Sequence, residues 1–264
     1  MYEPNSKISR YKISRIPKGN GKFREIYIPG LEDSKMLRSI IPELESILKE
    51  LDIYRANYAF QKGRNCSLNA LQHIGFRYTI SMDLVDFFNS IQVSHVANLI
   101  PAEIIAKCFV GGSPKQGLPT SPMISNIAFL RCDKEIIVAL RKLLPRFVYT
   151  RYADDLIVSF DNFSDVAKIT FVLKQISEQY GFEINPAKTK LQDGNNGSII
   201  VTGIAINKDG LAATRKTKRK IRAAKHQKNK TSESGLVEWS KCKLPKVFTT
   251  IMSVCTKTVP CTDK

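Results

Sequence analysis

The sequence lacks the features that would place a protein in a membrane or in an oxidising compartment. No apolar run approaches the roughly 20 residues of a membrane-spanning helix, and residues 1–17 contain no apolar segment typical of a signal peptide. The six cysteines form no CxxC pair and no zinc-ligand spacing, so we expect them to be reduced and mostly buried. These absences favour a cytoplasmic location.

Acidic residues are scarce beside basic ones. The 264 residues include 41 Lys and Arg against 24 Asp and Glu, a formal net charge of +17. This excess predicts a polyanionic partner, most simply nucleic acid; an anionic membrane surface is the alternative, but no segment resembles a surface helix with an apolar face. Residues 214–230 hold nine basic residues and no acidic one. Solvated helices usually mix both signs, so we expect this segment to contact the polyanion.

Alternating helical and strand patterns predict an α+β fold, and 43% hydrophobic residues suffice for a sizeable core. Turn residues flanked by β-formers predict hairpins at residues 12–30, 147–160 and 197–214. Apolar periodicity predicts helices at residues 34–54 (with Ser34 as N-cap), 65–75, 94–110, 123–144 and 164–181, and from 215 onward. Residues 78–82 are expected to form a strand, residues 111–122 a loop, and residues 182–192 a strand followed by a basic turn.

Two adjacent aspartates, Asp154 and Asp155, fall where the hairpin at 147–160 should turn. At a tight turn both side chains can reach one exposed point, where close carboxylates raise each other's pKa. Hard divalent cations offset this repulsion, and Mg²⁺ typically takes one or two carboxylates plus substrate phosphates. If the strand before Asp83 lies beside the hairpin, Asp83 and Asp154 can bridge two metal ions about 3.5–4 Å apart, as in nucleotidyl transfer. Taken alone, an Asp-Asp pair is more often a solvated turn.

Six segments occur in the order found in reverse transcriptases, which the sequence resembles from about residue 17 to residue 206. They are GKFREIYIP (fingers), SMDLVDFFNSI (first palm motif), PKQGLPTSPMISN, RYADDL, NPAKTK (lysine motif) and VTGIAI (primer grip). NALQH at 69–73 and VTG at 201–203 resemble patterns of bacterial retron enzymes, a lineage related to defence-associated and group II intron-like enzymes. A surface position for His73 and a simple hairpin glycine at Gly203 are the alternatives.

The resemblance implies a right-hand polymerase fold with fingers, an antiparallel-sheet palm and a short helical thumb. The fingers would span residues 1–80 and 92–126, interleaved with a palm of residues 81–91 and 127–206 that carries the YADD sequence. Residues 207–264 would form the short basic thumb.

The resemblance also implies the catalytic residues, which are Asp83, Asp154 and Asp155. Asp83 and Asp154 are expected to be the more direct metal ligands, with an additional oxygen from the Leu84 carbonyl. Asp155 is expected to orient the primer end or the metal more loosely. The implied cofactor is a pair of Mg²⁺ ions, for which Mn²⁺ can substitute.

Nucleotide binding is assigned by the same resemblance. Phe88 would lie under the incoming sugar and leave no room for a 2′-hydroxyl, although a place in the core is the alternative. Arg24 would bind triphosphate oxygens. Either Lys188 or Lys190 would serve the leaving pyrophosphate, unless both are surface lysines. The full predicted set is Arg24, Lys22, Phe88, Gln116, Gly117 and Lys188.

Primer and template binding is predicted at Tyr152, Val201, Gly203, Arg215, Lys216, Lys218 and Arg219. Trp239 follows the basic segment, and core packing is favoured over stacking on a base.

The sequence therefore predicts an RNA-directed DNA polymerase that copies a cognate noncoding RNA from a DNA or RNA primer with dNTPs, in bacterial anti-phage defence and without a membrane partner. Untemplated or protein-primed DNA synthesis, and a non-catalytic RNA-binding scaffold, are the alternatives. The identity of the RNA, the priming mode, a locus-encoded effector protein and homo-oligomer formation stay open.

Overall fold

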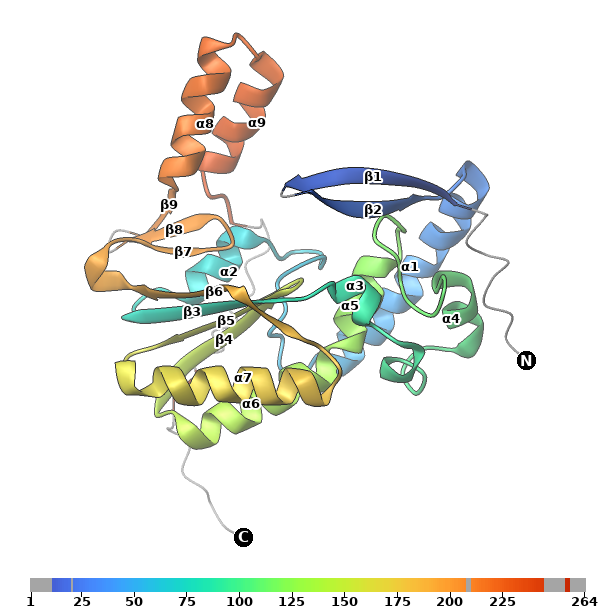
Figure 1. Ribbon diagram of the computed structural model, residues 1–264, viewed down its shortest axis with the longest axis horizontal. Helices are drawn as coiled ribbons and strands as arrows, with labels where there is room; N and C mark the ends of the chain where they lie inside the picture. The colour runs from blue at the N-terminus through green and yellow to red at the C-terminus, as the bar shows by residue number, and fades with distance from the viewer. Residues whose placement is uncertain (1–10, 20, 208–209, 245–254, 257–264) are drawn as a thin grey trace. The chain divides into compact units, whose positions relative to one another are not determined.

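The computed structural model describes residues 11–19, 21–207, 210–244 and 255–256 (Figure 1). The chain forms two compact units built from interleaved segments. The first unit comprises residues 1–54, 84–134 and 177–183, and the second comprises residues 55–83, 135–176 and 184–264. No helix in the described part of the chain has both the length and the apolar composition needed to cross a membrane.

The first unit begins with a two-stranded antiparallel ribbon, β1 (Lys12–Gly19) and β2 (Lys22–Ile28), which confirms the predicted hairpin. All of its helices except α1 are short. The helices are α1 (Leu31–Leu51), α3 (Phe87–Ser90), η2 (Val93–His95), α4 (Ala102–Cys108) and α5 (Ser121–Ala128). The predicted N-cap Ser34 is wrong, because Gly30 caps α1 and accepts the Ser34 N–H at 2.8 Å. The predicted helix at 94–110 is interrupted, because η2 ends at His95 and α4 begins only at Ala102, with Pro101 as its N-cap.

The predicted single helix at residues 123–144 is also wrong. The helix α5 ends and a second helix, α6 (Leu130–Leu143), follows, with Phe129 as the C-cap of α5. Phe129 is fully buried, and its ring lies 5.8 Å from that of Phe87 and 4.8 Å from that of Phe182. Packing of this ring in an aromatic cluster outweighs the local helical pattern.

The second unit contains a five-stranded sheet in the order β10-β4-β5-β3-β6. Its strands are β3 (Tyr78–Leu84), β4 (Arg146–Tyr152), β5 (Asp155–Phe160), β6 (Ile184–Asp193) and β10 (Cys255–Thr256). The pairs β4–β5 and β3–β5 are antiparallel. Helices α6 and α7 (Val166–Gln179) cover one face of this sheet (Figure 1). The predicted hairpin at 147–160 and the strand at 78–82 are thereby confirmed.

The strand β6 corrects the expected turn in the lysine motif. Instead of ending in a basic turn, the segment continues as one strand from Ile184 to Asp193. It lies at the edge of the sheet next to β3, where a strand tolerates Pro186. Extended pairing therefore carries the lysines of this motif along the sheet, with alternate side chains on the same face.

A smaller sheet, β7-β8-β9, packs with α2 (Cys66–Gln72) over a cluster of buried residues in the second unit. Its strands are β7 (Ile199–Val201), β8 (Ile204–Asn207) and β9 (Gly210–Ala213), so the predicted hairpin at 197–214 has a third strand. The buried cluster includes Ala70, Ile157 and Ile204. It joins α2 and the small sheet to β5.

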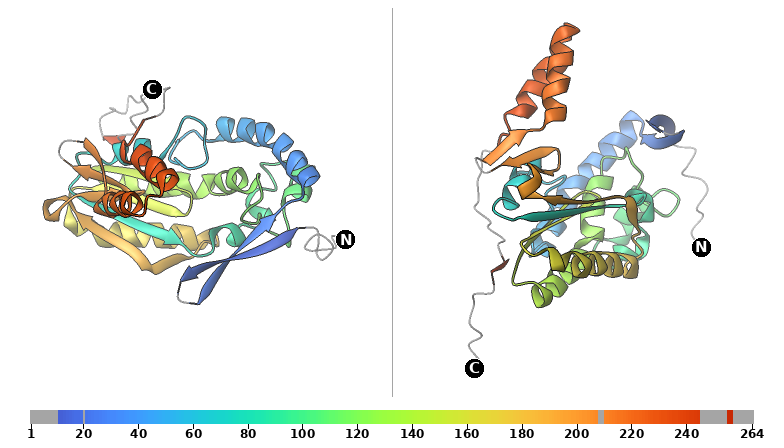
Figure 2. Two further views of the ribbon diagram at one scale, coloured as in Figure 1. Left: turned by 90° about the horizontal axis from the view of Figure 1, so that it is seen from above. Right: turned by 60° about the vertical axis from the view of Figure 1, so that its left-hand side comes forward.

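Two antiparallel helices follow β9, as Figure 2 shows. They are α8 (Arg215–His226) and α9 (Lys230–Ser240), which confirm the predicted basic helical region. Thr214 caps α8, since its hydroxyl accepts the backbone N–H of Thr217 at 3.2 Å.

The predicted domain division differs from the two units. Residues 55–80 were expected in the fingers but belong to the unit that contains the large sheet, and residues 207–264 do not form a unit of their own. The division into fingers, palm and thumb stays a prediction. The four cysteines whose side chains are described, Cys66, Cys108, Cys132 and Cys242, are free and buried as expected, and Cys255 and Cys261 lie outside that set.

Candidate active site

The two adjacent aspartates lie at the turn between β4 and β5, as predicted. Ala153 and Asp154 form the connection, and Ala153 has a φ of 56°, in the left-handed region that side chains with a Cβ rarely adopt. The fully buried Arg151 donates from Nη1 to the carbonyl oxygen of Ala153 at 3.2 Å. Arg151 was not predicted as a site residue, and its contact supports the backbone of the turn.

Asp83 and Asp155 lie opposite each other. They are register partners in the antiparallel strands β3 and β5, so their side chains share one face of the sheet. Burial is the largest cause that raises the pKa of Asp155 to about 6; Asp154 and Asp83 contribute to the rise, while Lys188 and Lys190 oppose it. The structure therefore gathers negative charge at a half-buried point and leaves it only partly neutralised by the protein.

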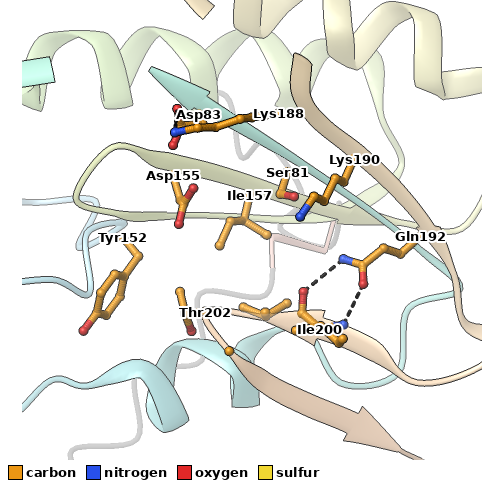
Figure 3. A pocket seen from close by; sticks show the side chains of 12 residues that line it. Ser81, Asp83, Tyr152, Asp155, Ile157, Lys188, Lys190, Gln192, Ile200 and Thr202 are labelled. Atoms are coloured by element: carbon orange, nitrogen blue, oxygen red, sulfur yellow. Dashed lines mark hydrogen bonds and ion pairs between the residues drawn. The ribbon is translucent and has the colours of Figure 1, made fainter. Parts of the chain in front are cut away.

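A cavity of about 440 Å³ opens on this carboxylate pair. Figure 3 shows side chains from the large sheet on one side and the turn between β7 and β8 on the other. The lining residues are Ser81, Asp83, Tyr152, Asp155, Ile157, Lys188, Lys190, Gln192, Ile200, Val201, Thr202 and Gly203. Predicted catalytic, nucleotide-binding and primer-binding residues thus meet in one cavity.

The two adjacent aspartates are placed differently with respect to the cavity. Asp155, which was given the looser role, lines the cavity with Asp83, whereas Asp154 lies in the turn and is not among the lining residues. Asp154 is close enough to raise the pKa of Asp155. Its role as a direct metal ligand, and that of the Leu84 carbonyl at the end of β3, stay predictions.

The lysine motif faces the same cavity. Strand alternation places Lys188, Lys190 and Gln192 on one face of β6. Lys188 Nζ lies 2.6 Å from Asp83 Oδ1, while Gln192 bonds the backbone of Ile200 at 2.8 and 3.0 Å. Sequence reasoning left Lys188 and Lys190 as equals, and the contact with Asp83 distinguishes them.

The donor set suits a hard divalent cation. Carboxylate oxygens are the preferred ligands of Mg²⁺, and the raised pKa of Asp155 indicates that further positive charge would be stabilising there. Within the described residues, however, no three His, Cys, Asp or Glu side chains are already gathered closely enough to hold a metal ion.

The primer-grip residues line the cavity in different ways. Val201 is buried in the apolar cluster with 1% exposure, whereas Gly203 is exposed in the turn with a φ of 79°. A Cβ added at Gly203 would lie 3.7 Å from Cζ2 of Trp239. The predicted core packing of Trp239 is not borne out, because its side chain is 43% exposed.

The predicted nucleotide-binding residues apart from Lys188 lie in the first unit. Arg24 is exposed on β2, and the side chain of Lys22 lies outside the described residues. Phe88 is half-buried on α3, and its neighbour Phe87 belongs to the buried aromatic cluster, as expected. Arg24 and Phe88 are thus accessible within their own unit.

The structure gives a local reason for a glycine at position 117. Its φ is 104°, and a Cβ there would lie 2.5 Å from the carbonyl oxygen of Tyr27. The adjacent Gln116 accepts the N–H of Tyr27 at 2.8 Å through its backbone oxygen. The glycine thus lets the loop backbone approach β2, and its predicted contact with the nucleotide stays untested.

Sequence reasoning missed Lys115, whose side chain is half-buried beside Gln116. Its ammonium donates to Asn89 Oδ1 at 2.9 Å and to Ser113 Oγ at 2.7 Å. Asn89 in turn donates to both carboxylate oxygens of Asp86 at 3.0 Å. Burial lowers the pKa of Lys115, while Asp86 and Glu25 oppose that shift. This network ties the loop to the short helix that carries Phe88.

The surface position considered for His73 is wrong. The ring is fully buried, and its nitrogens contact Ser159 Oγ at 2.8 Å and Thr150 Oγ1 at 2.7 Å. Burial lowers the pKa of His73 to about 3, so the ring is neutral near pH 7. His73 therefore links α2 to the middle of the large sheet as a structural residue.

The basic helix α8 presents its charge to solvent. The predicted binding residues, Arg215, Lys216, Lys218 and Arg219, are all exposed. None of them makes an ion pair within the part of the chain that the structure describes. Their positive charge is therefore open to an external anion.

A family model described as reverse transcriptase (RNA-dependent DNA polymerase) matches residues 16–227. The Ec73 retron reverse transcriptase of Escherichia coli is 31% identical over 78% of this chain and 72% of its own length. The Mx65 retron reverse transcriptase of Myxococcus xanthus is 27% identical over 88% of this chain. The chain spans 59% of that relative and 53% of the Mx162 enzyme from the same organism.

Solved structures resemble the fold. A telomerase from Candida albicans aligns with a TM-score of 0.56 and 16% identity, over 80% of this chain and 46% of its own. A foamy viral protease-reverse transcriptase aligns with a TM-score of 0.52 and 18% identity, over 81% of this chain and 32% of its own. These similarities support the predicted right-hand polymerase fold.

Proposed function

The chain belongs to the reverse transcriptase family, among the retron-like bacterial enzymes, and we propose that it is an RNA-directed DNA polymerase. The observation that carries this proposal is the pairing of Asp83 with Asp155 across β3 and β5, in a cavity that also contains the lysine motif and the β7–β8 turn. Family membership implies dependence on a divalent metal ion.

The residues that would hold the metal are Asp83, Asp154 and Asp155, with an oxygen from the Leu84 carbonyl. We propose Mg²⁺ as the ion, in a pair, with Mn²⁺ as a substitute. When bound, such ions activate the attacking hydroxyl and neutralise the leaving phosphates. The chain's own contribution is to fix the carboxylates on adjacent strands and to hold the turn through Arg151 and the Ala153 carbonyl.

Nucleotide selection is proposed for residues of the first unit. The exposed guanidinium of Arg24 suits triphosphate oxygens because its planar donors match them, and Lys22 would assist. Phe88 would exclude the 2′-hydroxyl of a ribonucleotide. The Lys115 network would hold the Gln116–Gly117 loop and the Phe88 helix in a fixed position relative to each other.

Template and primer binding is proposed for two parts of the second unit. Tyr152, Val201 and Gly203 line the cavity beside the carboxylates and would position the primer end. The exposed cations of α8 would contact phosphates with little sequence preference. The proposed substrates are a noncoding RNA template, a DNA or RNA primer and dNTPs.

A role in bacterial anti-phage defence is proposed with this activity, on the similarity to retron reverse transcriptases. Sequencing the nucleic acid that copurifies with the protein would identify the template and the priming mode. An effector partner, self-association and the cytoplasmic location stay predictions.

The direct test compares the wild type with the variant Asp154→Asn plus Asp155→Asn in labelled dNTP incorporation on a defined RNA template with Mg²⁺. We expect incorporation by the wild type to follow the template sequence and to fall at least about 1,000-fold in the variant, because each asparagine keeps only one neutral oxygen in place of a charged carboxylate. Equal background from both proteins would reject the polymerase. Product whose sequence ignores the template would favour untemplated synthesis instead.

The role of Phe88 is tested by Phe88→Ala. We expect incorporation of ribonucleotides to rise about 10-fold or more relative to deoxynucleotides, because the smaller side chain admits the 2′-hydroxyl. Phe171→Ala removes another phenylalanine ring, 63% exposed on α7, and serves as the matched control. If the two variants discriminate sugars as well as the wild type, Phe88 is not the selecting residue.

A further inference from the structure

Two lysines of β6 face the catalytic cavity, but only one of them contacts a carboxylate in the described part of the chain. Lys188 Nζ lies 2.6 Å from Oδ1 of Asp83, a short charge-assisted contact. Lys190 lies two residues along the same face and lines the same cavity without an ion pair in that part of the chain. Figure 3 shows the head of Lys188 against Asp83 and that of Lys190 farther along β6.

The contact uses the atoms that a metal ion would need. Mg²⁺ binds carboxylate oxygens at about 2.0–2.1 Å, so an ion on Asp83 would lie within a few ångströms of the Lys188 ammonium. Charges of the same sign at such a distance repel strongly in a partly buried site. The carboxylate of Asp83 therefore favours one cation at a time.

The two partners differ in their freedom to move. Asp83 is held in a central strand, and its side chain is 13% exposed. Lys188 lies on the edge strand, its side chain is 59% exposed, and its stem is long and flexible. The lysine can leave the carboxylate without repacking the sheet, so a competing cation would displace Lys188 rather than move Asp83.

We propose that Lys188 is the built-in counter-cation of Asp83 and that divalent metal binding proceeds by exchange with its ammonium group. This inference rests on the proposed function only in taking Asp83 as a metal ligand. It assigns Lys188 a positioning role that Lys190 does not share. It also implies an order of events, because the Lys188 ammonium becomes available to a substrate phosphate only after the metal has displaced it.

The matched variants are Lys188→Ala and Lys190→Ala, which remove the same charge from the same face of the same strand. Mn²⁺ binding to EDTA-treated and dialysed protein would be measured by the electron paramagnetic resonance signal of free Mn²⁺, at fixed ionic strength and without nucleotide. We expect Lys188→Ala to bind Mn²⁺ about 10-fold more tightly than the wild type, because the competing cation is gone. Lys190→Ala should change the affinity by less than about 3-fold, through long-range charge alone.

Two further variants separate competition from general effects of charge. Lys188→Arg retains a cation at this position and should not reproduce the gain in affinity. In an Asp83→Asn background, Lys188→Ala should no longer change the affinity for Mn²⁺, since the contact it relieves is already absent. If Lys188→Ala does not fold, Lys188→Gln keeps most of the stem without the charge and takes its place, with Lys190→Gln as its control.

Unfolding provides an independent readout. In EDTA the melting temperature of Lys188→Ala should fall below that of the wild type, because the carboxylates lose their counter-charge. Added Mn²⁺ should then raise it more than it raises the wild type, as tighter binding to the native state requires.

Several results would overturn the exchange: equal shifts in affinity for the two lysine variants, weaker or unchanged binding by Lys188→Ala, or no Mn²⁺ binding that depends on Asp83. These outcomes can be told apart from failure of the proposed function. Active polymerase with no difference between the lysine variants contradicts only the exchange. The expected order of Mn²⁺ affinities without nucleotide incorporation supports the exchange and contradicts the proposed activity.

Discussion

The cavity at Asp83 and Asp155 and the helix α8 are two charged regions of the second unit, and they use charge in opposite ways. In the cavity, carboxylates on β3 and β5 face lysines on β6, and one pair is in direct contact at 2.6 Å. On α8, cations follow one another with no acidic residue among them and remain exposed. The cavity partly neutralises its charge internally, whereas α8 leaves its charge for an external partner.

This difference has a physical consequence for each region. Charge that is half-buried interacts strongly at short range and resists screening by salt, so its effects appear in the pKa of Asp155 and in metal affinity. Charge that is exposed is screened by salt, so its effects appear in the salt dependence of binding. Variants of the cavity should therefore leave the salt dependence of nucleic-acid binding unchanged. Variants of α8 should leave the metal affinity and the pKa of Asp155 unchanged.

The largest expected effect on stability comes from Asp155→Asn. The folded-state pKa of Asp155 is about 6, above its ordinary value of 3.8. Between these values the native state holds the proton more firmly than the unfolded chain, so stability falls as pH rises through this window, by about 3 kcal/mol in total. In EDTA at pH 8, Asp155→Asn should therefore unfold at a higher urea concentration than the wild type.

The matching measurement is the pH profile of the unfolding midpoint from pH 4 to pH 8. The difference between variant and wild type should grow with pH and level off above about pH 7. A constant difference across this range would show that the carboxylate of Asp155 is not under electrostatic strain, and would weaken the contrast with α8.

An intermediate effect is expected on α8. Neutralising Arg215, Lys216, Lys218 and Arg219 should lower affinity for an RNA–DNA duplex by about 10- to 100-fold at low salt and reduce the slope of log affinity against log salt by up to about 3. Mn²⁺ affinity should not change. Fluorescence anisotropy across a salt series measures both quantities.

The control removes four basic residues from the helices that cover the other face of the sheet. They are Arg141, Lys142, Lys168 and Lys174, which are all exposed. This variant has the same net charge as the α8 variant, so a loss of affinity that depends only on total charge would be equal in both. An equal change in salt slope would mean that α8 does not contact the duplex.

The smallest effect is expected at Gly203, which lines the cavity and lies beside Trp239 of α9. Gly203→Ala should cost about 1 kcal/mol, because a residue with a Cβ is strained at its φ of 79°. The added methyl group would meet Trp239 at an ordinary contact distance of 3.7 Å, so no clash adds to this cost.

Gly235→Ala is the control, because Gly235 lies within α9 and an added Cβ meets nothing within 4 Å. It should stabilise the protein by up to about 1 kcal/mol through helix propensity. The two substitutions therefore have opposite expected signs in a urea titration. A gain in stability at both positions would indicate that the β7–β8 turn is not held in its left-handed conformation.

Much of the fold followed from local patterns. The ribbon β1–β2, the Asp-Asp turn and the basic helix α8 were predicted because turn residues, apolar alternation and helical periodicity all act within a few neighbouring residues. The break at Phe129 was not, because it depends on rings from other segments, Phe87 and Phe182. The continuation of β6 was missed for a similar reason, since its pairing with β3 spans about a hundred residues.

The candidate site divides along the same line. The sequence shows the residue types and their order, so Asp83, Asp154 and Asp155 could be predicted as site residues from their motifs. Three contacts could not be predicted from the sequence. Asp155 rather than Asp154 lines the cavity with Asp83, and Lys188 rather than Lys190 contacts the carboxylate of Asp83. The third is the hydrogen bond from Lys115 to Asn89. Each depends on which side chains meet across strands or loops.

By itself, the sequence determined which chemical groups this protein carries. They are carboxylates at a turn, two lysines separated by one residue, and a run of basic residues with no acidic residue among them. Only the tertiary structure decided which of those charges face each other and which face the solvent. The reason is that Coulomb interactions depend on distance and burial, and strand pairing between distant segments sets both. Without the pairing of β6 with β3, the order of the residues alone does not show that Lys188, and not Lys190, contacts Asp83.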